Sequence, residues 1–240
     1  MIHISVQIEK IDYEKSIETF LPQIVAELSA KKSAGGLAQF VVRLGADAVP
    51  VAKKLLGYMD DSLKDGLVVW MTESRQTEIV AAVNQHLGSL FGKSVMKVGA
   101  VTAEDRPGTR LALCASQVEI DYGALMNSPA VDSALGQIGG GGGLLKGAAK
   151  FALQMASKAN PETLEKQGTA LLSSDLVKGK MTSALTGAIG KVGLAAELGD
   201  LSVQAGAGPA AKAGGDGQLP EELKNKLADA VIAFLRANAK

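Results

Sequence analysis

The sequence predicts an α+β protein in which two diverged strand–helices–strand repeats share one mixed sheet of about four strands, with an amphipathic helix added at the C-terminus. Three sequence matches occur in the same order in both halves and support an internal duplication. They are Ile-Asp-Tyr after an alternating apolar segment, a later Gly-Gly-Leu, and a closing Lys-Val-Gly. The matching positions are 11–13, 35–37 and 97–99 in the first half and 120–122, 142–144 and 191–193 in the second. Chance similarity between Ala- and Gly-rich helices is the alternative explanation.

The repeats determine the predicted organisation of the chain. Repeat unit 1 covers residues 1–104 and repeat unit 2 covers residues 110–205, and we expect the two to form one compact body. Segment 206–219 is rich in Gly and Ala, a composition typical of a flexible linker. The C-terminal helix occupies residues 220–240.

Four segments have the patterns of strands: 2–9, 95–103, 110–121 and 194–204. The first alternates aliphatic with polar residues, as a half-buried strand does. The sequence from Arg106 to Thr109 suits a type II turn, so the second and third segments should form an antiparallel hairpin. The apolar phase changes near Ser116–Gln117, which a β-bulge would explain, and changes again near Gly199–Asp200.

Helical patterns fill the sequence between the strands of unit 1. Asp12 is predicted to cap the first helix and Asp47 a later one, because Asp accepts hydrogen bonds from the free N–H groups of a first turn. A third helix is predicted over 74–91, with Gly92 as its stop. Residues 66–71 contain the single tryptophan of the chain and are predicted to be a strand or loop specific to unit 1.

Composition narrows the class of protein. The 25 Lys and Arg residues equal the 25 Asp and Glu residues, so no net field would direct the chain to nucleic acid. A single cysteine, Cys114, rules out an internal disulfide framework. The N-terminus lacks the pattern of a signal peptide, and no apolar run approaches the ~18 residues of a membrane span. We therefore expect a cytoplasmic protein with no transmembrane segment and no nucleic-acid partner.

Few residues could carry chemistry. His3 and His86 have no Cys or second His at ligand spacing, which predicts no metal and no cofactor. Cys114 lies in a predicted strand and is interpreted as a small buried thiol. Five glycines at 139–143 lack the residue order of a phosphate-binding loop and are interpreted as a joint between helices. No catalytic residue is predicted, so an enzyme is uncertain and disfavoured.

The repeated Asp-Tyr pairs are the leading candidates for a ligand site or interface. They are Asp12 with Tyr13 and Asp121 with Tyr122. If both pairs approached a shared two-fold axis, their carboxylates could share a proton or a cation. Alternatively, each Asp caps a helix and each Tyr begins an apolar stripe. Trp70 is a further candidate for a pocket or interface, with a core position as the alternative.

The C-terminal helix carries an apolar stripe that must be buried against the body or another chain. The stripe consists of Leu223, Leu227, Val231, Phe234 and Leu235. We therefore expect a non-catalytic interaction or assembly protein that self-associates or docks a protein partner through this helix. A carrier for an apolar small molecule or lipid is the alternative, and an unrecognised enzyme comes third.

Overall fold

The computed structural model describes residues 2–30, 43–106, 109–129, 132, 162, 166, 169, 170, 172–205 and 219–239, and these form five strands and seven α-helices. The strands are β1 (Ile2–Ile11), β2 (Met96–Lys97), β3 (Ala100–Arg106), β4 (Thr109–Ile120) and β5 (Ala196–Ala205). The helices are α1 (Tyr13–Ala30), α3 (Ala48–Leu56), α4 (Asp61–Ser74), α5 (Gln76–Phe91), α6 (Tyr122–Met126), α10 (Asp175–Lys191) and α11 (Glu221–Asn238), with a 3₁₀ turn (Gly45–Asp47) before α3.

The sheet is open and antiparallel. Its order is β3-β4-β1-β5, and β2 pairs with the far end of β4 on the same side as β3. The predicted mixed sheet is therefore wrong, because β1 is antiparallel to both β4 and β5, and β4 is antiparallel to β2 and β3. The predicted strand 95–103 is in two pieces, interrupted at Val98 and Gly99, which brings the number of strands to five.

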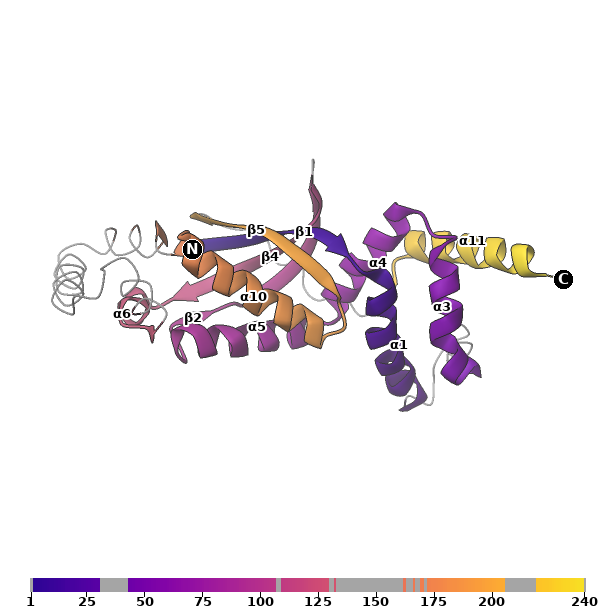
Figure 1. Cartoon of the computed structure of the whole chain (residues 1–240), viewed down its shortest axis with the longest axis horizontal. Coiled ribbons are helices and arrows are strands. Elements are labelled where there is room, and N and C mark those ends of the chain that lie inside the picture. Colours follow the sequence, from indigo (N-terminus) through magenta and orange to yellow (C-terminus); the bar gives the residue numbers. More distant parts are fainter. Residues whose placement is uncertain are drawn as a thin grey trace.

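The connectivity is the β-α-β-β-α-β pattern of split β-α-β, or ferredoxin-like, sheets, with additional helices. Helices α5 and α10 pack side by side against the sheet and make the two crossovers, to β2–β3 and to β5 (Figure 1). Helices α1, α3 and α4 are inserted between β1 and α5. Together with α11 they form a helical end, on the right of Figure 1, which α4 joins to the sheet by packing against β3. None of these four helices is needed to complete the sheet and its two covering helices.

The main core lies between the sheet and the α5–α10 pair. Aliphatic residues of the two inner strands, among them Val6 of β1 and Leu113 of β4, are buried there. Val83 and Leu87 of α5 and Ile189 of α10 meet them from the helical side. This buried apolar surface is the chief source of stability for the sheet half of the molecule.

Both predicted changes of apolar phase coincide with irregular strand pairing. Gln117 has φ = 54°, and the β1–β4 register shifts between Ile2 and Ile4, which confirms a bulge at this place. As a result, Leu113 and Val118 both face the core although they are an odd number of residues apart. In β5, Leu198 pairs with Ile8 of β1, and the register shifts on both sides of this pair. This irregularity confirms the second predicted change of apolar phase, near Gly199–Asp200.

Helix ends follow the predicted capping residues in part. Asp12 Oδ1 accepts from Lys15 N at 2.9 Å, and Asp121 Oδ1 accepts from Ala124 N at 2.9 Å. Gly92 ends α5 with φ = 103°, a left-handed conformation that glycine adopts without steric cost. Asp47 precedes α3, but its side chain makes no capping hydrogen bond.

Segment 66–71 corrects the sequence prediction, because it lies inside α4 and is neither strand nor loop. Asp60 begins this helix by accepting from Leu63 N at 2.7 Å. Val68 and Thr72 then face inward with helical spacing. The β-branched pair before Trp70 favours a strand locally, and the cap and the tertiary packing override that preference.

Several predictions lie outside the described residues. They concern Pro107–Gly108 of the turn, the Gly-Gly-Leu matches at 35–37 and 142–144, the glycines at 139–143, and segment 206–218. In the part of the chain that the structure describes, no helix is both long and apolar enough to cross a membrane.

Candidate ligand pocket

The helical end contains an apolar pocket that arises from the sequence periodicity of two helices. In α1, Tyr13, Ile17, Phe20 and Leu21 follow the spacing that places side chains on one helix face. In α4, a stripe from Lys64 to Met71 has the same spacing. The two stripes face each other without closing completely, and α3 forms a third wall.

The space between these helices has a volume of about 120 Å³. Its lining comprises Tyr13, Ser16, Ile17, Phe20 and Leu21 from α1, Ala52 and Leu56 from α3, Met59, and Lys64, Leu67, Val68 and Met71 from α4. Among the lining residues, Ser16 already has two partners, because its hydroxyl donates to Asp12 O and accepts from Ala195 N. The interior is therefore suited to an apolar group.

Polar contacts outside the pocket hold its walls in place. Lys53 of α3 forms ion pairs with Glu14 and Glu18 of α1. The hydrogen bond with Glu18 is the main cause that raises the pKa of Lys53 above its ordinary value of 10.5, while desolvation acts in the opposite direction. Between α1 and α4, the Tyr13 hydroxyl donates to Asp65 Oδ1 at 2.6 Å.

The inner end of the pocket is closed by an aromatic ring and a cation. Phe20 is buried, and the guanidinium of Arg75 lies 4.7 Å from the centre of its ring. Arg75 also pairs with Glu78 at 3.0 Å. Phe20 and Met71 also line a second, much smaller space of about 10 Å³ beside Arg75 and Ile79, so the pocket narrows sharply at Phe20.

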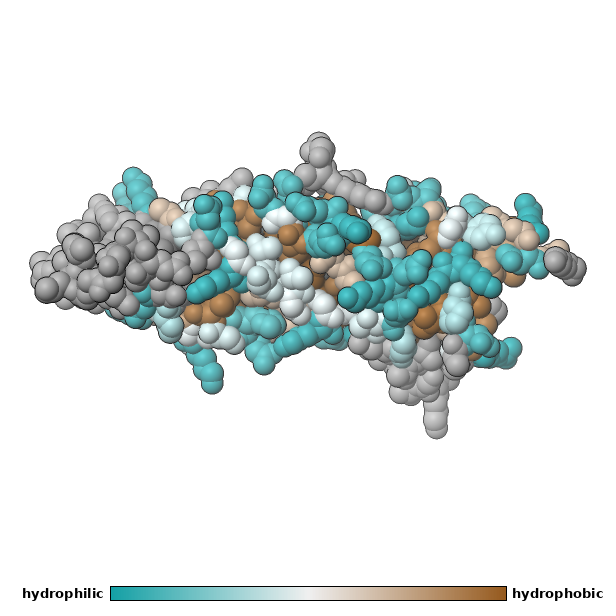
Figure 2. All heavy atoms as spheres, in the orientation of Figure 1, coloured by the Kyte–Doolittle hydropathy of each residue, from teal (hydrophilic) through white to brown (hydrophobic). Residues whose placement is uncertain are grey.

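The outer end opens beside a lysine. Tyr13, Leu56 and Lys64 line both the apolar pocket and a wider surface depression outside it. The Lys64 side chain is 21% exposed, and its Nζ lies 6.0 Å from the centre of the Tyr13 ring. Figure 2 shows hydrophobic residues at this helical end, between α1 and α3 and beside α11, with hydrophilic residues around them.

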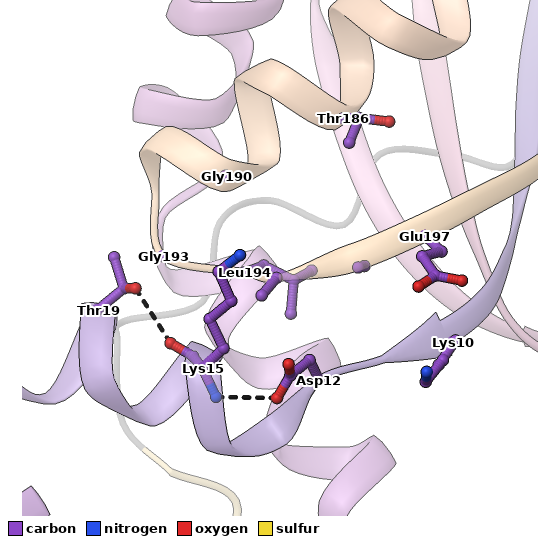
Figure 3. Close-up of a pocket in the computed structure, with 11 residues that line it drawn as sticks. Lys10, Asp12, Lys15, Thr19, Thr186, Gly190, Gly193, Leu194 and Glu197 are labelled. Carbon is purple, nitrogen blue, oxygen red and sulfur yellow. Dashed lines mark hydrogen bonds between the residues drawn. The ribbon is translucent and has the colours of Figure 1, made fainter.

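A larger hollow, about 300 Å³, lies where β1 meets α1 and α10 meets β5 (Figure 3). Lys15 extends from α1 across it toward Gly193 and Leu194, and Lys10 and Glu197 lie close together on neighbouring strands. The lining contains two lysines and two carboxylates, Asp12 and Glu197, so its charges compensate. These charged side chains are exposed or capping a helix, which favours a solvated surface feature over a binding site.

The two Asp-Tyr pairs do not come together. Because β1 and β4 are antiparallel and Ile2 lies opposite Val118, Asp12 and Asp121 lie at opposite ends of the sheet. The strand between them is roughly 30 Å long at the usual rise per residue. A shared proton or cation between these carboxylates is excluded by this separation. Tyr13 lines the apolar pocket, and Tyr122 packs against the main core.

The remaining sequence candidates occupy separate places. Trp70 lies in α4, half-buried, and its Nε1 is buried with no hydrogen-bond partner among the residues that the structure describes. Cys114 is buried in β4. His86 lies on α5 with Nε2 buried next to Gly187 of α10. Within the described ranges, no three His, Cys, Asp or Glu residues are grouped so that they could hold a metal.

The C-terminal helix packs against the same chain, on α3 and α4. Leu223 lies directly over Gly66 of α4, and Phe234 contacts Tyr58 edge to face with ring centres 5.6 Å apart. Leu227 and Val231 are half-buried between them. Leu235 departs from the predicted stripe, because it is 56% exposed.

Sequence reasoning singled out one wall residue of the pocket, Tyr13, as a site candidate. The prediction of a strand or loop over 66–71 does not place Leu67 and Met71 on a helix face, and nothing in the local pattern marks Lys64 as a site residue. The sequence signal for this helix is an Asp cap at position 60 followed by apolar residues at helical spacing.

No protein-family model, no curated protein and no solved structure matches the chain.

Proposed function

We propose that this protein binds a small apolar molecule in the pocket between α1, α3 and α4. The observation that supports this proposal most directly is the lining, in which side chains from three helices leave an open space of about 120 Å³ that is almost wholly apolar. An engineered cavity of about 150 Å³ with a similar lining stays dry and accepts benzene. The pocket therefore has the size and chemistry for one small apolar group.

The position of the pocket in the fold also supports binding. The sheet with α5 and α10 forms the split β-α-β arrangement, and α1, α3 and α4 are additions to it. Binding and catalytic residues are often carried by segments that a rigid scaffold positions. The half-buried apolar residues of α1 and α4 would gain contacts if the space were filled.

Blocking the pocket tests this proposal. Toluene or hexan-1-ol added to the ¹⁵N-labelled chain should shift amide signals of α1, α3 and α4 in the wild type. Ala52→Phe fills the pocket from α3 and should abolish those shifts. Ala81→Phe, at an exposed position of α5, is the matched control and should leave the shifts unchanged. If the wild type shows no shift at the helical end with either compound, the proposal is wrong.

Assembly through α11 is a second candidate, favoured by three exposed apolar side chains. Ile232 is 45% exposed, Leu235 is 56% exposed, and Tyr58 of the neighbouring α3–α4 connection is 40% exposed. A partner protein or a second copy could cover them while the opposite face of α11 stays on α3 and α4. The double variant Ile232→Lys with Leu235→Lys, measured by mass in solution against the wild type, tests self-association. An unchanged mass would argue against it.

We also infer that the two halves share one ancestral unit. Each half has a strand, a covering helix and a second strand that pairs with the first strand of the other half. A two-fold axis between β1 and β4 would exchange these elements, which supports duplication. Superposing β1, α5 and β3 on β4, α10 and β5 tests it, and a poor fit of the two helices would contradict it.

A further inference from the structure

Lys64 has an unusual position for a lysine, at the mouth of an apolar pocket and mostly out of solvent. Its ammonium group forms no hydrogen bond to the residues that the structure describes, and its ion pair with Asp61 is long, at 3.7 Å. The Asp61 side chain is 74% exposed, so that pair is weak and screened by solvent. The ammonium therefore keeps donors for an anionic group at the mouth.

The other charged groups near the mouth do not occupy the hydrogen-bond donors of the Lys64 ammonium. Glu14 and Glu18 are paired with Lys53 on the far side of the outer depression. Asp12 accepts the backbone N–H of Lys15, and Asp65 accepts the Tyr13 hydroxyl. These carboxylates therefore have partners other than Lys64.

The volume limits the apolar part of a ligand. About 120 Å³ is close to the space that one six-membered hydrocarbon ring occupies in a protein cavity. A long acyl chain would have to pass Phe20, and the space that shares Phe20 with the pocket there is only about 10 Å³. The ligand must therefore be short.

We infer that the ligand is a small monocarboxylate whose apolar group has about six carbons, with the tail in the pocket and the carboxylate at Lys64. This inference rests on the proposed function, because it assigns the ligand class of the same pocket. A carboxylate fits better than a neutral molecule because it can accept two hydrogen bonds from the Lys64 ammonium. Among the residues that line the pocket, Lys64 is the one lysine, which matches a single negative charge; Lys10, Lys15 and Lys53 line the outer depression instead.

The test compares three unbranched compounds of six carbons each that differ in charge: hexanoate, hexan-1-ol and hexylammonium. Each is titrated into the full ¹⁵N-labelled chain at neutral pH, where the carboxylate is ionised. Hexanoate should bind about tenfold more tightly than hexan-1-ol, and hexylammonium more weakly than both. Decanoate should not bind more tightly than hexanoate, because the closed inner end cannot take four more carbons.

Variants at Lys64 separate charge from folding. Lys64→Met keeps the length and apolar stem and should weaken hexanoate binding more than hexan-1-ol binding, so that the preference for hexanoate disappears. Lys64→Arg keeps the charge and should retain most of the preference. Lys54→Met, on an exposed position of α3 outside the pocket lining, is the matched control and should behave as the wild type.

The outcomes distinguish the two levels of the proposal. Equal binding of hexanoate and hexan-1-ol, or an undiminished preference in Lys64→Met, overturns the carboxylate inference while the pocket keeps its proposed role. If none of the three compounds shifts signals of α1, α3 or α4, both the inference and the proposed function are wrong. Tighter binding of decanoate overturns the size limit and with it the ligand class stated here.

Discussion

Asn84 on α5 replaces two hydrogen bonds that the sheet does not make. Its Nδ2 donates to Val98 O at 2.9 Å, and its Oδ1 accepts from Val98 N at 2.8 Å. Val98 lies between β2 and β3, where the edge strand is interrupted, and it is buried. The side chain thus satisfies both backbone groups of a residue that would otherwise have unpaired polar atoms in the core.

Removing this amide should be costly. Asn84→Ala leaves both the N–H and the C=O of Val98 without their partner, and we expect the free energy of unfolding to fall by about 2–3 kcal/mol. Asn225→Ala, at an exposed position of α11, should change it by less than about 0.5 kcal/mol. Chemical denaturation of both variants measures the difference. Equal effects would show that water replaces the side chain at no cost.

The glycine of the repeated Lys-Val-Gly motif has a different role in each half. Gly193 has φ = 94°, and a Cβ there would lie 3.0 Å from Phe20 Cβ and 3.2 Å from Phe20 Cα. Gly99 does not have a positive φ, and a Cβ there would instead meet the Gln117 side chain at 2.6 Å. Glycine is therefore required at Gly99 and at Gly193 for different steric reasons.

Gly193→Ala should destabilise the protein by about 1–3 kcal/mol, because the left-handed backbone and the nearby Phe20 main chain both oppose a side chain. Gly190→Ala, three residues earlier within α10, meets no atom within 4 Å and should be neutral or stabilise by up to about 1 kcal/mol. Thermal unfolding of the pair distinguishes the two positions. A stabilised Gly193→Ala variant would contradict the conformation described for this turn.

At the scale of elements, α11 is attached to the body by a narrow contact. One face lies on α3 and α4, where Ala230 is buried, and the other carries the exposed Ile232 and Leu235. Leu223 can approach α4 closely because Gly66 has no side chain beneath it. The amphipathic pattern alone does not distinguish a neighbour in the same chain from one in a second copy.

Two apolar residues of α11, two positions apart, should therefore differ in their effect on stability. Phe234→Ala loses the edge-to-face contact with Tyr58 and a half-buried ring, and we expect a loss of about 2 kcal/mol in the free energy of unfolding. Ile232→Ala removes a largely exposed side chain and should cost less than about 0.5 kcal/mol. If denaturation shows the reverse order, the face of α11 that contacts the body has been assigned incorrectly.

At the scale of the whole molecule, the sheet half and the helical end differ in how they are stabilised. The sheet half has two inner strands and two helices around one buried core, whereas the helical end contains an open pocket and half-buried residues. The elements of the helical end should open at lower free energy than the inner strands.

Native-state hydrogen exchange measures this difference. Amides of β1 and β4, such as those of Val6 and Leu113, should exchange last, and amides of α11 should exchange at least about a hundredfold faster. A saturating pocket ligand should slow exchange in α1, α3 and α4 more than in β1. Uniform protection across both parts would mean that they unfold as one unit.

Local sequence patterns determined much of the fold. Alternating apolar residues determined the strands around Val6, Leu113 and Leu201. The changes of apolar phase within these strands indicated where the strand pairing is irregular. Asp12 and Asp121 marked helix starts because a capping bond depends on residues only three positions apart. Interactions of this range can be predicted from the chain alone.

Only the tertiary structure decided which of these elements meet. Strand order and direction depend on contacts such as Ser5 with Ser202, whose hydroxyl groups are 2.7 Å apart although 197 positions separate them in sequence. Contacts between residues far apart in sequence also explain why the residues before Trp70 are helical although their local pattern favours a strand. The pocket could not be predicted for the same reason, because its three walls come from separate helices. The period of a helix shows which residues share a face, but the partner of that face is a property of the packed molecule.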